Sequence, residues 1–120
     1  MELRSVATVI DHGVATFEFA VACEVFGIDR SDDGLPVFDF AICSPQGGLV
    51  RGRNGLQLIA PHRLEPLETA DLIVVPAMTI DYRPGPELIA VLRAGVERGA
   101  RVISLCSGAF VLGEAGLLDG

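Results

Sequence analysis

The sequence contains neither tryptophan nor lysine, and it has a single tyrosine. No apolar run approaches the roughly 18 residues that a membrane-spanning helix needs. The N-terminal segment "MELRSVATVI" lacks the basic region, the long apolar segment and the cleavage site of a signal peptide. These absences predict a cytoplasmic protein that does not enter a membrane.

Cysteine is also scarce, since Cys23, Cys43 and Cys106 are the only three and lie far apart. An odd number of scattered cysteines predicts neither a disulfide framework nor a C-x-x-C redox or zinc site. Cys23 and Glu24 have no histidine or cysteine partner at metal-ligand spacing. We therefore expect reduced thiols, no metal site and no cofactor. Cys43, at the end of an apolar segment, is expected in the core.

Positive charge is in short supply, with 9 basic residues against 16 acidic ones and a formal net charge of −7. The arginines are scattered along the chain. A nucleic-acid-binding surface needs clustered Lys and Arg to displace counterions from phosphates. Direct contact of these residues with nucleic acid is therefore not expected.

Apolar residues, by contrast, make up 50% of the 120 residues. This content predicts a packed core, and the length suits one domain spanning residues 1–120 without internal repeats. Short apolar, β-branched segments alternate with segments of helical periodicity. Strands are predicted at residues 4–10, 37–44, 70–77 and 101–105, helices at 16–27, 86–99 and 107–118, and a β-hairpin around "GRNG" at 52–55.

This alternation, with strands that are apolar on both faces, predicts a doubly wound, flavodoxin-like α/β fold with a mostly parallel sheet and helices on both faces. Gly27 suits a left-handed helix cap. The acidic residues Glu65, Glu68 and Asp71 suggest a solvated stretch before a strand.

Binding sites in doubly wound sheets lie at the carboxyl ends of the strands. Three predicted loops leave the sheet at that edge: "DHG", "PAMT" and "CSG".

The segment around Cys106 has the pattern of a nucleophile elbow. A strand leads into the cysteine, a helix follows at once, and the small residues Ser104 and Gly108 flank it at two positions on either side. Ser107 would offer its backbone N–H at the helix start, where the helix dipole lowers the pKa of a thiol. The alternative is that Cys106 is a small buried hydrophobic residue, which is common for free cysteine.

Three segments resemble the ThiJ/PfpI superfamily, which has the class I glutamine amidotransferase-like fold. They are "VISLCSGAFVLGEAGLLDG", "DHGVATFEFAVACEVFG" and "ADLIVVPA", and they occur in the superfamily's order along the whole chain. The sequence pattern of these segments most resembles the N-terminal sensor domain of AraC-family transcriptional regulators of the GlxA type. Isocyanide hydratases share much of the same sequence pattern.

The resemblance implies that Cys106 is the elbow cysteine and that the carboxyl group of Glu18 hydrogen-bonds its sulfur. From the residues alone, Glu18 could equally be a solvated glutamate on a helix edge. The resemblance also places an oxyanion-hole N–H at Ala77 or Met78. The family usually has glycine after the proline of this loop, so a positive φ at Ala77 would be strained.

A catalytic histidine is the missing part, since many enzymes of this superfamily have one on the strand after the elbow helix. His12, in the loop after the first strand, could approach Cys106, although an exposed or capping role is more usual. His62 is expected at the surface. The superfamily's domain normally continues with further strands and a helix, so residues 1–120 resemble a domain truncated after the elbow helix, at Gly120.

Two functions follow from these patterns, together with a compatible third. The first is a ligand-sensing or dimerising domain of an AraC-type regulator, whose ligand is an unknown small molecule near Cys106, Glu18, Ala77, Met78, Ser107 and His12. It would form a homodimer and contact DNA through a C-terminal domain outside this chain. The second is a cysteine-dependent hydrolase, hydratase or amidase-like enzyme using Cys106 and Glu18. An oxidant-sensing thiol could coexist with either.

Overall fold

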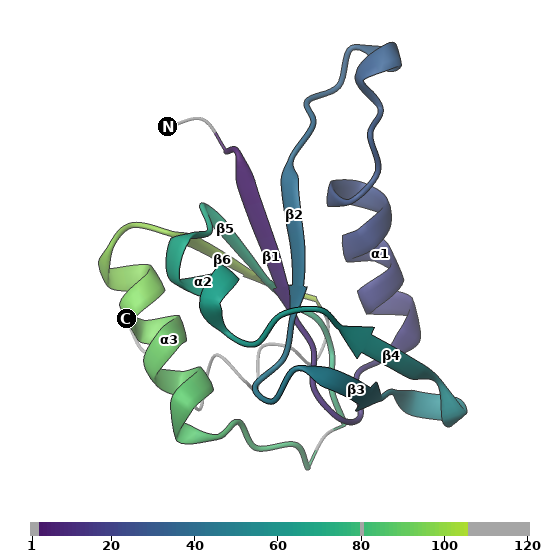
Figure 1. Cartoon of the computed structure of the whole chain (residues 1–120), viewed down its shortest axis with the longest axis vertical. Coiled ribbons are helices and arrows are strands. Elements are labelled where there is room, and N and C mark those ends of the chain that lie inside the picture. Colours follow the sequence, from purple (N-terminus) through teal and green to yellow (C-terminus); the bar gives the residue numbers. More distant parts are fainter. Residues whose placement is uncertain (1–2, 80, 106–120) are drawn as a thin grey trace.

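Four parallel strands form the central sheet of the computed structural model, which describes residues 3–79 and 81–105 (Figure 1). The strands lie side by side in the order β2-β1-β5-β6. Their bounds are Ser5–Val9 for β1, Asp39–Cys43 for β2, Leu72–Val75 for β5 and Arg101–Ser104 for β6. Each agrees with a strand predicted from the sequence, with shorter ends.

The chain winds in both directions from β1. It passes through α1 (Thr16–Phe26) to β2 on one side, then returns through α2 (Glu65–Thr69) to β5 on the other side. From β5 it continues through α3 (Pro86–Glu97) to β6. The direction of winding therefore reverses between β1 and β5, and such a switch point is where doubly wound sheets bind ligands.

Helices cover both faces of the sheet, as the sequence predicted. Figure 1 shows α1 on one side of the sheet and α2 and α3 on the other. Ala22 and Phe26 of α1 pack with Val6 and Val74, whereas the opposite cluster joins residues of α2 and α3 to the other face of β1 and β5. Every residue of β5 is buried, because this central strand is covered on both faces.

The predicted hairpin is also present. β3 (Gly48–Arg51) and β4 (Gln57–Ala60) pair antiparallel, and a 3₁₀ turn over Arg53–Gly55 joins them. Asn54 has a φ of 59°, the only positive value among the non-glycine residues that the structure describes. Asparagine tolerates this left-handed conformation better than most residues, which explains why the turn forms here.

Gly27 does not adopt the left-handed conformation that the sequence suggested, since its φ is −96°. Its glycine is required by crowding instead. A Cβ atom at this position would lie 2.8 Å from the backbone oxygen of Cys23 and 3.0 Å from Cδ2 of Phe40. A side chain at position 27 would therefore collide with the last turn of α1 and with Phe40 of β2.

The acidic stretch before β5 is a short helix, α2, which was not predicted from the sequence. Leu67 on this helix is fully buried against the sheet, while Glu65 and Glu68 are exposed as expected. Asp71 is not simply solvated, because its Oδ2 accepts hydrogen bonds from the backbone N–H groups of Arg4 (2.9 Å) and Ser5 (3.1 Å). It joins the start of β1 to the start of β5.

No helix in the described part of the chain has both the length and the apolar character needed to cross a bilayer. The elbow helix predicted at 107–118 lies outside the described residues.

Candidate functional site at the carboxyl edge of the sheet

The loops that follow β1 and β5 contact each other at the switch point. The backbone N–H of Ala15 donates to the carbonyl oxygen of Ala77 at 2.9 Å. Gly13 has a φ of 90°, and a Cβ atom there would lie 2.9 Å from Oγ1 of Thr79. Glycine at this position lets the two loops approach closely.

A buried carboxylate fixes the same two loops to each other. Asp11, only 8% exposed, accepts a hydrogen bond at Oδ2 from the hydroxyl of Tyr82 at 2.7 Å. Its Oδ1 accepts the backbone N–H of His12 at 2.8 Å. Burial of the phenol, then the hydrogen bond to Asp11 and its negative charge, raise the pKa of Tyr82 well above its usual range. The phenol is therefore a neutral donor.

The pairing of Asp11 with Tyr82 was not predicted from the sequence. The available signals were the single tyrosine of the chain, six residues after Pro76, and an acidic residue directly at the end of an apolar strand. Neither signal says that the two side chains meet, because their separation of 71 residues is closed only by the pairing of β1 with β5.

His12 is exposed and binds the hairpin. Its Nδ1 accepts the backbone N–H of Arg51 at 3.0 Å. In neutral imidazole one nitrogen accepts and the other carries the proton, so this contact places the proton on Nε2. His12 thus fastens the end of β3 to the loop after β1, and its approach to Cys106 stays a prediction.

Glu18 lies in the first turn of α1 and is half-buried. No hydrogen bond or ion pair joins its carboxyl group to another residue within 3–79 or 81–105. The carboxyl group is therefore available for a partner, and its predicted bond to the sulfur of Cys106 stays a prediction.

Ala77 and Met78 are both buried, each at 2% exposure. Ala77 does not have a positive φ, so the strain that alanine would cause in place of the family's glycine is absent. The carbonyl of Ala77 faces Ala15, and in a trans peptide the following N–H points the opposite way. The N–H of Met78 is therefore directed away from the loop after β1.

Burial raises the pKa of two of the three thiols. Cys43 is fully buried, its Sγ donates to the carbonyl of Thr8 at 3.4 Å, and burial followed by the charge of Glu65 raises its pKa to about 12. The expected core position is confirmed. Burial, then the charge of Glu24, also raises the pKa of the half-buried Cys23. Within the described residues, His, Cys, Asp and Glu form no group that could hold a metal ion.

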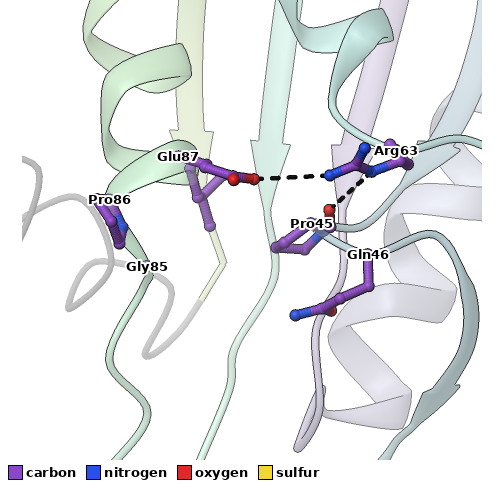
Figure 2. A pocket seen from close by; sticks show the side chains of 7 residues that line it. Pro45, Gln46, Arg63, Gly85, Pro86 and Glu87 are labelled. Atoms are coloured by element: carbon purple, nitrogen blue, oxygen red, sulfur yellow. Dashed lines mark hydrogen bonds and ion pairs between the residues drawn. The ribbon is translucent and has the colours of Figure 1, made fainter.

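A hollow of about 310 Å³ lies farther along the same edge, between the loop after β2 and the start of α3 (Figure 2). Arg63 spans it, donating from Nε to the carbonyl of Pro45 at 3.3 Å and pairing with Glu87 at 3.8 Å. The side chains of Arg63 and Glu87 are 60% and 70% exposed, so this pair contributes little stability. None of the site residues predicted from the sequence lines this hollow. Its lining residues are Pro45, Gln46, Arg63, Gly85, Pro86, Glu87 and Leu88.

Comparison with known structures identifies the fold. No family model matches the chain. The structure superposes on a THiJ/PfpI family protein from Pseudomonas syringae with a TM-score of 0.78 and 19% identity, across 100% of this chain and 49% of that one. The fold is that of the ThiJ/PfpI superfamily.

Other relatives add to this likeness. An AraC family transcriptional regulator from Pseudomonas putida superposes with a TM-score of 0.77 and 28% identity, across 97% of this chain and 63% of that one. An uncharacterized protein in the cpoL 5′ region of Streptomyces lividans is 50% identical over 50 residues, which are 41% of this chain and 36% of that protein. The chain spans less than two thirds of the length of each. The predicted resemblance to ThiJ/PfpI proteins and to AraC-family regulators is confirmed.

In this ThiJ/PfpI fold, β6 leads towards the predicted elbow. The N–H of Leu105 donates to the carbonyl of Val75 at 3.0 Å, so the residue before Cys106 lies beside the start of the "PAMT" loop. Cys106 and Ser107 lie outside the described residues. Their roles as elbow cysteine and N–H donor stay predictions.

Proposed function

We propose that this chain is the ligand-sensing domain of an AraC-family transcriptional regulator. The observation that carries the proposal is the likeness to the Pseudomonas putida regulator, which extends over 97% of this chain at 28% identity. The loops after β1 and β5, which contact each other at the switch point, support a small-molecule site at this edge. Cys106 and Glu18 would border it.

DNA contact would come from a part of the regulator outside these residues. The matched regulator is longer than this chain, which covers 63% of it. The formal net charge of −7 also disfavours direct contact with phosphates. We further propose that the regulator acts in the cytoplasm as a homodimer.

The gene sequence beyond codon 120 tests this proposal most directly. A helix-turn-helix region in the same reading frame is the expected finding. A frame that completes a ThiJ/PfpI-type domain and then stops would contradict the regulator function. The protein encoded by the whole frame should then bind an operator fragment in a gel-shift experiment, while residues 1–120 alone should leave that fragment unshifted.

A cysteine-dependent enzyme is the second candidate, either a hydrolase, a hydratase or an amidase-like protein. It is favoured by the carboxyl group of Glu18, which is half-buried and has no partner among the described residues. Cys106 would be the nucleophile and Glu18 its acid–base partner. Activity against amide, ester and isocyanide substrates should then disappear in Cys106→Ser. Activity that survives this substitution would exclude the mechanism.

A further inference from the structure

The backbone of Arg53, in the turn between β3 and β4, is held against the loop after β1. Its N–H donates to the carbonyl of Val14 at 3.0 Å, and its own carbonyl accepts the N–H of Leu56 at 3.2 Å. The preceding residue, Gly52, packs so closely that a Cβ atom there would lie 3.2 Å from the same Val14 oxygen. The starting point of the Arg53 side chain is therefore well defined.

The guanidinium group of Arg53 reaches the loop after β5. One of its terminal nitrogens donates to the carbonyl of Met78, a residue that is buried. The tip of this side chain thus lies at the contact between the two loops that form the candidate site. Arg53 joins three segments: the hairpin, the loop after β1 and the loop after β5.

Among the described residues, this group has one hydrogen-bond partner, the carbonyl of Met78. A guanidinium group has five N–H donors, and the contact with Met78 occupies one nitrogen. No carboxylate among residues 3–79 and 81–105 forms an ion pair with Arg53, although the chain as a whole is strongly acidic. By contrast, Arg30 and Arg63 each pair with a glutamate.

Asp11, the acidic residue of the loop after β1, forms no ion pair with Arg53. Asp11 has both carboxylate oxygens occupied, by the hydroxyl of Tyr82 and by the N–H of His12. The imidazole of His12 accepts at Nδ1, so its second nitrogen is a further donor at the same loop. Arg53 is exposed, so its guanidinium group is accessible from solvent at this edge, and the second nitrogen of His12 offers a further donor there.

We propose that Arg53 recognises a carboxylate group of the ligand, an inference that rests on the ligand-sensing function proposed above. Guanidinium and carboxylate groups match as planar forks with two parallel hydrogen bonds. The contact with Val14 holds the backbone of Arg53 and the contact with Met78 restricts its side chain, so binding costs less conformational entropy than it would for a free arginine.

A matched pair of probes tests this inference on the ¹⁵N-labelled chain. Butyrate and butyramide have nearly the same shape, but only butyrate is charged. At constant ionic strength, butyrate should shift the Arg53 side-chain signal and the Gly13 and Thr79 amide signals saturably, while butyramide should leave them unchanged. Equal shifts with both probes, or no saturable shift with butyrate, would overturn the inference.

Substitutions identify the residue responsible. Arg53→Gln keeps a side-chain donor for the Met78 carbonyl but removes the charge, and it should weaken butyrate binding by about tenfold or more. Arg53→Lys should recover only part of this loss, because an ammonium group has no planar fork. Arg51→Gln is the control, since the exposed side chain of Arg51 has no partner among the described residues, and binding should change by less than about twofold.

If Arg51→Gln weakens binding as much as Arg53→Gln, the effect is one of overall charge and the inference fails. The regulator proposal fails separately, on the gene sequence beyond codon 120. A chain that binds butyrate through Arg53 without a downstream helix-turn-helix keeps the carboxylate site and loses the regulator. If a helix-turn-helix follows but the chain does not bind butyrate, the regulator function is kept and the carboxylate site is excluded.

Discussion

At the scale of single residues, the hydroxyl group of Tyr82 stabilises the candidate site, because its hydrogen bond to Asp11 connects the loops after β5 and β1. Tyr82→Phe keeps the ring but leaves one oxygen of the buried Asp11 carboxylate without its donor. We expect the free energy of unfolding to fall by about 1–3 kcal/mol, as is usual for an unsatisfied buried acceptor. Urea unfolding followed by circular dichroism measures this change. Equal stability of the two proteins would mean that solvent replaces the phenol without cost.

Reactivity distinguishes the three cysteines. Near pH 6, Cys106 should react with iodoacetamide faster than Cys23 and Cys43, because a thiolate at a helix N-terminus is favoured. Cys43 should stay unlabelled in the folded protein, since it is buried and its pKa is raised to about 12. Peptide mass spectrometry after graded labelling times gives the three rates. A rate for Cys106 no greater than that of Cys23 would contradict the activated thiol.

At the scale of elements, the crowding at the end of α1 leads to a further prediction. Gly27→Ala introduces a Cβ atom 2.8 Å from the backbone oxygen of Cys23, and a backbone atom cannot move aside as a flexible side chain can. We expect a loss of about 1–3 kcal/mol in thermal or urea unfolding, typical of overpacking. Ala20→Ser on the exposed face of the same helix is the control and should cost no more than about 0.5 kcal/mol. An equal loss in Ala20→Ser would contradict crowding at position 27 as the cause.

The same region shows where sequence patterns stop being informative. The strands were predictable because each is an apolar, β-branched segment of strand length bounded by loop residues, as in "LIVV" of β5. The glycine at position 27 was visible, but the clash that a Cβ there would make with Phe40 arises only from the tertiary fold. Helix α2 was missed because five residues, two of them glutamate, contain a single fully buried position, Leu67.

The candidate site was predictable only in part. The loops "DHG" and "PAMT" were identified because each follows a buried strand, and parallel strands end at one edge of the sheet. Their partners Arg53 and Tyr82 were not, since a hairpin turn and a surface loop have no motif that announces a contact. Only the strand order β2-β1-β5-β6 and the fold of the hairpin bring these side chains to the loops.

At the scale of the whole molecule, the excess of acidic residues raises the question of stability at low pH. Most carboxylates are exposed and need no partner, but Asp71 accepts two backbone N–H groups from the start of β1. The hydrogen bonds from Arg4 and Ser5 are the largest causes that hold the pKa of Asp71 below its usual range. Its ionised form is therefore favoured by folding.

A group whose pKa is lower in the folded state than in the unfolded state stabilises the fold above its unfolded pKa. The contribution of Asp71 should be complete above about pH 5 and should disappear as the pH falls below about 4, through the lowered folded pKa. Asp71→Asn removes the titration, because an amide oxygen accepts hydrogen bonds at every pH. The two proteins share every other carboxyl group, so the difference between their unfolding free energies isolates Asp71. That difference should favour the parent protein at pH 7 and shrink between pH 4 and pH 2; a difference that is constant with pH would show that the ionisation of Asp71 is not linked to folding.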